Sequence, residues 1–243
     1  LCAQGMLSCT DVNANYRDIA NDVAVQPGTG GNVILANVAW RSGAAYNGFY
    51  LSRDGGTTWT KVNPLGAINP KDIGNATIQY SADGSKLYVV LESPAALNSG
   101  AASALAGVYV SDTGAAAGPY NQIANPSTLA QSGSAERKQR IGKGYAPGVQ
   151  AWYNQFIGVD PTNAKHVYVG LEEVYESWDG GTSWKTIGRY WDFGFSCWSN
   201  IDADNTCDGN VLHSDQHTIA FGSGTSAGQV YVGNDGGLYQ RAV

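Results

Sequence analysis

Short runs of apolar residues separated by polar, glycine-rich turns dominate this chain, and no long segment has the spacing of an amphipathic helix. The runs are rich in Val, Ile and Tyr, which is typical of β-strands. Clear examples are residues 33–36, 86–91, 107–111 and 230–233. The pattern therefore predicts an all-β protein built from many short strands.

Two octets in the chain have the same spacing of chemically similar residues. Their shared positions are Ser52, Asp54, Gly56 and Trp59 in the first, and Ser177, Asp179, Gly181 and Trp184 in the second. Each octet lies between two strand-like runs, so its Asp-Gly-Gly segment predicts a hairpin turn in which the glycines adopt positive φ and the aspartate accepts backbone amides. We interpret both octets as structural, with each Trp buried between outer strands.

The segments around the octets repeat as well, which indicates a repeat protein. We assign repeat units to residues of about 19–63, 75–124, 151–188 and 215–243, with the corresponding serines at positions 52, 111 and 177 roughly 60 residues apart. The second unit has a degenerate octet, with Tyr120 in place of the Trp, and the fourth unit lacks its last strand. Residues 1–18 form an N-terminal segment. Either this segment supplies the missing strand and closes the ring, or the whole chain is a fragment of a larger ring. We favour the fragment.

The octet pattern S-x-D-x-G-x-x-W resembles the Asp-box, or BNR repeat, of sialidase-like and sortilin-like β-propellers. Residues 150–161, 169–173, 213–217 and 232–237 look like those of secreted bacterial or fungal glycosyl hydrolase-like Asp-box proteins. This resemblance implies an all-β propeller of four-stranded antiparallel blades with Asp-box hairpins, about four in this chain with the last incomplete. It also implies a secreted, extracellular protein that acts on or binds glycans.

A propeller fold does not by itself carry an activity. The Arg-Ile-Pro signature of sialidases is absent from this sequence, so we do not expect sialidase activity. Two classes remain open: a glycoside hydrolase-like enzyme, and a non-catalytic propeller module that binds glycan or protein.

The charge of the chain restricts its partners. A formal net charge of −6 argues against binding to nucleic acid or to an anionic membrane, and no apolar run has the length of a membrane span. The expected partners are a glycan, an extracellular protein or a second polypeptide that completes the ring.

Cysteines and a short acidic segment suggest two further features. Local pairing predicts the disulfides Cys2–Cys9 and Cys197–Cys207, as suits an oxidising compartment, although four cysteines allow three connectivities. The acidic segment has alternating oxygen ligands that are reminiscent of a calcium loop, but it lacks the glycine and the terminal glutamate of that motif. These ligands are Asp202, Asp204 and Asp208.

Strand order predicts where a functional site lies. In a four-stranded blade, the octet turns share one end with the turns between first and second strands, whereas the long connections lie at the other end. Because loops on a rigid scaffold usually carry function, we expect the site at the long-loop end. The candidate catalytic carboxylates there are Glu172, Glu173, Asp192 and Asp215, with Glu92 at the equivalent position of its own unit.

Ligand-binding candidates at this end are aromatic residues and histidines, namely Tyr190, Trp191, Trp198, His213 and His217. The aromatic residues either form a glycan groove or pack as a small core under a disulfide-closed loop. Strand alternation would place His213, Asp215 and His217 on one face, which is a geometry that can hold a transition metal. A hydrogen-bonded polar cluster is the alternative, and we favour it.

Overall fold

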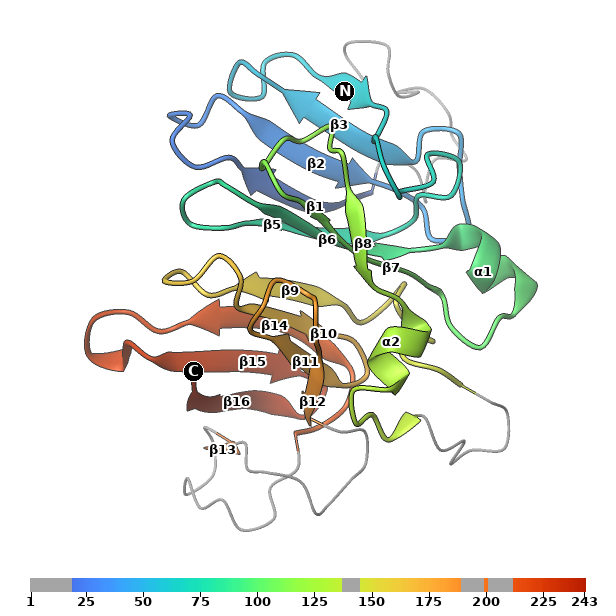
Figure 1. Cartoon of the computed structure of the whole chain (residues 1–243). Helices are drawn as coiled ribbons and strands as arrows, with labels where there is room; N and C mark the ends of the chain where they lie inside the picture. Colours follow the sequence, from blue (N-terminus) through green and yellow to red (C-terminus); the bar gives the residue numbers. More distant parts are fainter. Residues whose placement is uncertain (1–18, 137–144, 189–198, 201–211) are drawn as a thin grey trace.

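The computed structural model describes residues 19–136, 145–188, 199–200 and 212–243. These residues form an all-β protein of four antiparallel sheets, each with four strands (Figure 1). The expected class and blade organisation are therefore confirmed. Within the described ranges, no helix is both long and apolar enough to cross a membrane.

The four sheets, which we call blades 1 to 4, follow one another along the chain. Blade 1 consists of β1 (Ala20–Val25), β2 (Ile34–Val38), β3 (Gly48–Ser52) and β4 (Thr60–Val62). Blade 2 consists of β5 (Ala76–Tyr80), β6 (Leu87–Glu92), β7 (Leu105–Ser111) and β8 (Asn121–Ala124). Blade 3 consists of β9 (Phe156–Val159), β10 (Val167–Gly170), β11 (Val174–Ser177) and β12 (Lys185–Gly188).

Blade 4 is completed by a strand that precedes it in the sequence. Its consecutive strands are β14 (Gln216–Phe221), β15 (Gln229–Asn234) and β16 (Gly237–Ala242). The fourth strand is β13 (Ser199–Asn200), which pairs antiparallel with β16. The sequence pattern predicted only three strands for this blade, because a strand of two residues has no periodicity that can be detected.

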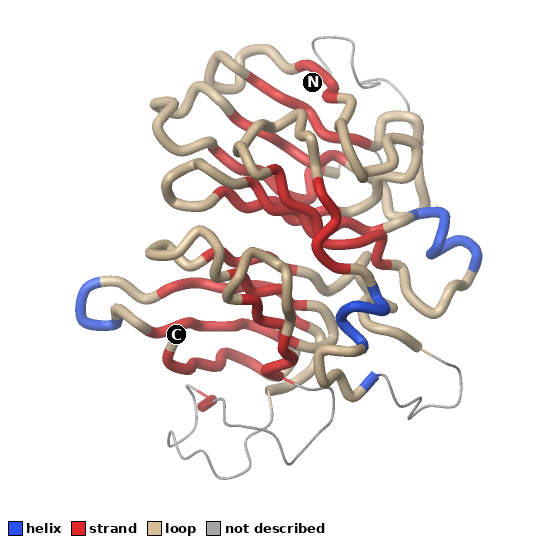
Figure 2. Tube along the Cα trace, in the orientation of Figure 1, coloured by secondary structure: helices blue, strands red, loops and turns tan. Residues whose placement is uncertain are grey.

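The hydrophobic core lies mainly between neighbouring blades. One cluster joins blades 1 and 2, a second joins blades 2 and 3, and a third joins blades 3 and 4. Apolar side chains on both faces of the sheets are buried for this reason, as in β6, whose six residues are all buried. The blades are accordingly stacked in the order of the sequence, from blade 1 to blade 4 (Figures 1 and 2). Their first strands, β1, β5, β9 and β14, lie next to one another.

The two octets adopt the predicted turn. In the first, the amide of Gly56 donates to Oγ of Ser52 (2.8 Å), and the amide of Thr58 donates to Oδ1 of Asp54 (2.8 Å). The second repeats these bonds around Ser177 and Asp179 within about 0.1 Å. The hydrogen bond from the Thr58 hydroxyl is the main reason why the pKa of Asp54 is lowered to about 2. An ionised aspartate thus closes each turn.

The octet tryptophans are half-buried, not fully buried as expected. Trp59 packs beside Val38 and Tyr50 of its own blade, whereas Trp184 packs against the core between blades 2 and 3. The indole of Trp184 also donates to the carbonyl of Ile123 (3.1 Å). Each indole therefore lies at the outer rim of a blade with one side in solvent.

Gly181 explains why the second octet can approach the preceding blade so closely. Its φ is +95°, and an added Cβ would lie 2.6 Å from the side chain of Ile123 in β8. Any larger residue would be strained and would also push blades 2 and 3 apart. In the degenerate octet of blade 2, Tyr120 is fully buried and its hydroxyl donates to the carbonyl of Ala116 (2.7 Å).

Two short helices lie within the long connections, where the sequence pattern indicated loops. They are α1 (Pro94–Ser99) and α2 (Pro126–Ala130). Ser93 and Asn125 cap their N-termini through side-chain oxygens, and a proline follows each cap. Both helices follow strands that run away from the octet turns. We call this end of the blades the loop end, and the opposite end the octet end.

Candidate functional site

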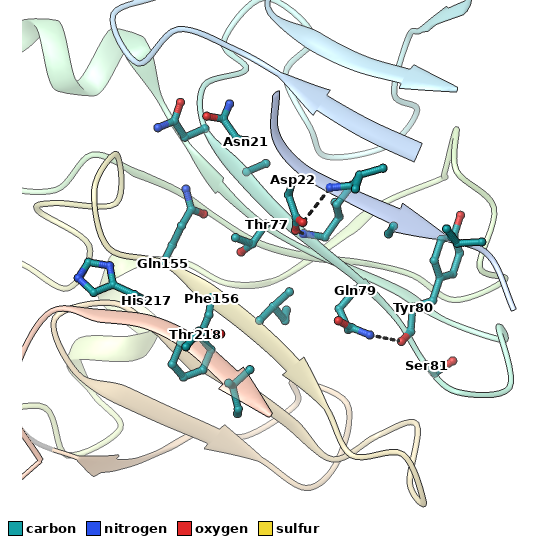
Figure 3. A pocket seen from close by; sticks show the side chains of 18 of the residues that line it. Asn21, Asp22, Thr77, Gln79, Tyr80, Ser81, Gln155, Phe156, His217 and Thr218 are labelled. Atoms are coloured by element: carbon teal, nitrogen blue, oxygen red, sulfur yellow. Dashed lines mark hydrogen bonds between the residues drawn. The ribbon is translucent and has the colours of Figure 1, made fainter. Parts of the chain in front are cut away.

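The first strands of the four blades surround a pocket of about 630 Å³. Figure 3 shows side chains from β1 and β5 gathered around this space together with side chains from β9 and β14. The lining is mostly polar, and its described residues include no Lys or Arg. The pocket therefore suits an uncharged ligand that forms many hydrogen bonds better than an anionic one.

An aromatic row borders this pocket at the loop end. The guanidinium of Arg41 lies over the ring of Trp152 (4.2 Å) and near that of Trp40 (5.5 Å). Trp152 is followed by Tyr153, with centroids 5.7 Å apart, and Tyr153 meets the ring of His217 edge to face at 5.0 Å. We call these five residues the aromatic row. The row brings together residues from the loop ends of blades 1, 3 and 4.

Several polar atoms on the pocket wall have no protein partner. They are Oδ1 of Asn75, Oγ1 of Thr77, the hydroxyl of Tyr80 and Oε1 of Gln155. A buried polar atom without a partner costs free energy, so a group of them beside one pocket points to a ligand or ordered water that satisfies them. Asn75 and Thr77 are on the second blade and Gln155 is on the third, so these atoms reach the pocket from two sides.

A hydrogen-bonded group stands at the loop-end rim of the pocket. The Nε2 atom of His217 lies 2.6 Å from Oδ1 of Asp235, and the hydroxyl of Tyr153 donates to the same oxygen (3.2 Å). The bond from His217 is the largest of the effects that lower the pKa of Asp235. The Asp235 carboxylate is therefore held in its ionised form at the surface, next to two rings of the aromatic row.

Asp215 lies beside this group in a different environment. Its φ of +67° is the only positive value among the described non-glycine residues, which marks a strained backbone. The side-chain amide of Asn154 donates to its Oδ1 (2.7 Å). Burial, followed by the nearby charge of Asp235, raises the pKa of Asp215. The two neighbouring carboxyls thus have pKa values shifted in opposite directions.

Glu172 and Glu173 are buried and hold the long loops in place. The carboxylate of Glu172 accepts the amides of Gly148 (2.7 Å) and Gln150 (2.6 Å), one on each oxygen. That of Glu173 accepts the amide of Ala135 (2.9 Å) and the Tyr175 hydroxyl (2.8 Å). These contacts use both oxygens of each side chain within the protein. Glu172 therefore fixes the segment that leads into the aromatic row, and Glu173 fixes the end of the connection near Ala135.

Glu136 joins the same acidic group. Burial, together with the charges of Glu172, Glu173 and Asp215, raises its pKa well above the usual value, and its Oε2 atom has no protein partner. Burial likewise raises the pKa of Glu172 to about 7, because it outweighs the opposing amide hydrogen bonds. The structure thus brings together three of the four carboxylates that the sequence proposed, along with one that it did not.

The residues of the H-x-D-x-H segment do not share one strand face. Asp215 has a left-handed backbone before β14 begins, and the pairing of β14 with β15 is irregular between Gln216 and Thr218. The Nδ1 atom of His213 lies 2.9 Å from the carbonyl of Ser214, whereas His217 contacts Asp235. The described residues contain no group of three His, Cys, Asp or Glu side chains that could hold a metal ion. The simple alternation argument was wrong for this segment, because the strand starts after Asp215.

Other sequence candidates lie outside the described residues. They are the catalytic candidate Asp192, the aromatic candidates Tyr190, Trp191 and Trp198, the calcium candidates Asp202, Asp204 and Asp208, and the cysteines Cys2, Cys9, Cys197 and Cys207. The N-terminal segment 1–18 also lies outside them. Their assignments stay predictions.

The sequence contained a signal for the aromatic row. Trp40 lies two residues after the second strand of blade 1, and the Trp152–Tyr153 pair lies shortly before the first strand of blade 3. Both are positions at the loop end of a blade, although Trp152 also packs against the core between blades 2 and 3. Their proximity depends on the curvature of the stacked blades, which the sequence pattern does not contain.

Comparisons with known proteins support the fold. No model of a known protein family matches the sequence, and no curated protein matches it. Among solved structures, an ancestral GH74 enzyme is 16% identical with a TM-score of 0.51, over 92% of this chain and 25% of the other. YCF48 bound to D1 peptide is 14% identical with a TM-score of 0.49, over 93% and 51% of the two chains.

A further match is an exo-β-1,3-galactanase from Phanerochaete chrysosporium, with 12% identity and a TM-score of 0.44, over 89% and 47% of the two chains. The chain spans about a quarter to a half of the length of these three proteins. At these identities the likeness concerns the fold alone. The chain has the fold of a β-propeller, and the solved structures similar to it include glycoside hydrolases.

Proposed function

We propose that this chain is a secreted, Asp-box-type propeller that binds a neutral glycan through the loop end of its blades. The aromatic row beside the polar pocket carries the proposal. Aromatic rings offer flat apolar surfaces to the C–H faces of a sugar ring, and the polar wall supplies partners for its hydroxyl groups. The octet hydrogen bonds and the likeness in fold to an ancestral GH74 enzyme support the same class.

The charges near the pocket favour a neutral sugar over sialic acid. Recognition of the sialic acid carboxylate needs arginine or another cation, and the described pocket lining has neither Lys nor Arg. Asp22 lines the pocket, and Asp235 contacts two residues of its rim. Arg41 is stacked on Trp152 outside the pocket lining. An anionic ligand would therefore meet mainly negative charge.

Affinity gel electrophoresis with soluble β-glucan, galactan and mannan tests the proposal, followed by titration calorimetry with the polysaccharide that retards migration. Tyr153 is 48% exposed, so Tyr153→Ala removes a ring of the row with little disturbance of the core. We expect this change to weaken binding about 10-fold or more, as befits the loss of one exposed aromatic contact.

Trp178→Ala is the matched control, because Trp178 is also an exposed aromatic residue but lies at the octet end. It should leave the affinity unchanged. Binding that is lost equally in both variants, or that is strongest for a sialylated glycan, would contradict a neutral-glycan site at the loop end.

A non-catalytic module that binds protein is the second candidate. The observation that favours it is the exposed position of the rim group, since Tyr153, His217 and Asp235 are all accessible. Tyrosine is enriched at protein interfaces relative to the rest of the surface. Failure of all three polysaccharides to bind would favour this second function.

A further inference from the structure

We propose that Asp215 and Asp235 form a catalytic pair that hydrolyses the bound glycan, with Asp215 as the proton donor and Asp235 as the nucleophile. This inference rests on the proposed function, since it assigns chemistry to the same glycan site. It also differs from the sequence hypothesis, because Asp235 replaces Glu172 and Glu173, whose carboxylates are used to hold loops.

The two aspartates are neighbours at the end of one hairpin. In the β14–β15 ladder Gln216 pairs with Asn234, and the amide of Asp235 donates to the carbonyl of Asp215 (3.3 Å). This backbone hydrogen bond holds the two aspartates next to each other at the loop end. The retaining mechanism needs two carboxyls only about 5–5.5 Å apart, whereas the inverting mechanism needs a wider separation, so we assign the retaining mechanism to this neighbouring pair.

The surroundings of each carboxyl suit its role. Asp215 is half-buried, and one of its oxygens accepts from Asn154, which leaves the other to carry a proton. Burial and the charge of Asp235 raise its pKa, as a general acid requires. Asp235 is exposed and accepts from Tyr153, and its pKa is lowered chiefly by the bond with His217. It is therefore an ionised nucleophile beside the aromatic row.

Asp235 is linked to the pocket through Tyr153 and His217, which line the pocket and contact the Asp235 carboxylate. Asn154, which holds Asp215, is fully buried and its own Oδ1 atom has no protein partner. Asp215 itself has a strained backbone, a feature that is typical of functional residues. The unusual features therefore lie on the residue that we assign as the acid and on the residue that holds it.

The reaction has two balanced steps. First, protonated Asp215 gives its proton to the glycosidic oxygen, the bond from the anomeric carbon to that oxygen breaks with its electron pair on the oxygen, and a carboxylate oxygen of Asp235 bonds to the anomeric carbon. Second, ionised Asp215 takes a proton from water, and the water oxygen displaces Asp235 from the anomeric carbon. One water molecule is consumed and each residue regains its starting state.

The test uses β-glycosides of disaccharides of glucose, galactose and mannose, each with a 4-methylumbelliferyl or a 2,4-dinitrophenyl leaving group. Asp215→Asn should lower kcat by about 100-fold or more on the first leaving group, which needs protonation. It should lower the glycosylation rate far less on the second, which does not. Asp235→Asn should lose activity on both. Asparagine tolerates a positive φ, so Asp215→Asn keeps the local backbone.

Asp112→Asn is the matched control, because this exposed carboxylate pairs with Lys86 at the octet end, and it should retain full activity. Binding of β-glucan, galactan and mannan is measured in parallel for all variants. Binding by the wild type without hydrolysis of any aryl glycoside would overturn the catalytic pair while leaving the binding function intact. An Asp215→Asn variant as active as the wild type on the umbelliferyl substrate would also overturn it.

Discussion

The imidazole of His166 stacks on the indole of Trp178, with ring centroids 3.4 Å apart and an interplanar angle of 16°. His166 is fully buried, and each ring nitrogen faces a carboxylate: Nδ1 lies 2.9 Å from Asp160 and Nε2 lies 3.0 Å from Glu176. Burial alone would raise the pKa of both acids, yet hydrogen bonds keep the net pKa of each below its usual value. One histidine thus joins two ionised carboxylates across blade 3.

Replacing His166 by Leu should destabilise the protein by about 3 kcal/mol, because it leaves two buried carboxylates without their shared partner. The free energy of unfolding from urea titration at pH 7 measures this loss. Trp178→Ala is the comparison, since it removes the stacked ring but leaves both hydrogen bonds of His166, and Trp178 is 56% exposed. We expect it to cost under half as much. Equal losses in the two variants would mean that stacking, not the contacts with the two carboxylates, carries the stability.

The contacts of His166 could not be predicted from the sequence. The sequence drew attention to His213 and His217 because they are close in the chain, whereas His166 stands alone between strands. Its partners Asp160 and Glu176 lie in or beside neighbouring strands of the blade, so their proximity depends on the strand register. By contrast, the octet turns were predictable, because a Ser, an Asp and two glycines determine their hydrogen bonds locally.

The candidate site was predictable only in part. Strand order placed the candidates Glu172, Glu173 and Asp215 at the loop end, but it could not give the distances between them. The contribution of Asp235 could not be predicted, since it depends on which residues face each other across the β14–β15 pair. The left-handed backbone of Asp215 precedes β14, which begins at Gln216, so the expected alternation does not extend to Asp215 and His213.

The two octet tryptophans should differ in their contribution to stability. Trp184 packs against the core between blades 2 and 3 and donates to Ile123 of the preceding blade, so Trp184→Ala weakens an inter-blade contact. Trp59 packs on residues of its own blade. Removing a fully buried Trp costs about 3–5 kcal/mol, and we expect about 2–3 kcal/mol for half-buried Trp184.

Chemical denaturation of Trp184→Ala and Trp59→Ala, followed by circular dichroism, compares the two positions. The smaller loss should occur at Trp59. A larger loss at Trp59 than at Trp184 would show that packing within a blade matters more than the contact between blades.

Glu92 should make the protein less stable at pH 8 than at pH 5. Its side chain is fully buried, with Oε2 accepting the amide of Asn75 (2.7 Å) and Oε1 without a protein partner. Burial raises its pKa to about 8, and this effect outweighs the amide hydrogen bond and the charge of Arg41. The folded protein therefore keeps a proton on Glu92 at pH values where the unfolded chain has lost it.

The direction of the effect follows from proton linkage. Between the unfolded pKa of about 4.5 and the folded pKa of about 8, the folded state binds more protons, so the free energy of unfolding falls as pH rises. Since one pKa unit corresponds to about 1.4 kcal/mol, we expect Glu92 to contribute a loss of roughly 2 kcal/mol or more across this range. Half-buried Glu136 and buried Glu172, whose pKa values are also raised, add losses of the same sign.

Glu92→Gln isolates the contribution of this one group. Glutamine keeps an acceptor for the Asn75 amide but cannot ionise, so the variant should gain stability relative to the wild type as pH rises from 5 to 8. Urea titrations of both proteins at pH 5, 6, 7 and 8 measure the difference at each pH. Parallel curves for the two proteins would mean that Glu92 is already ionised in the folded state at pH 5, and that burial does not hold its proton.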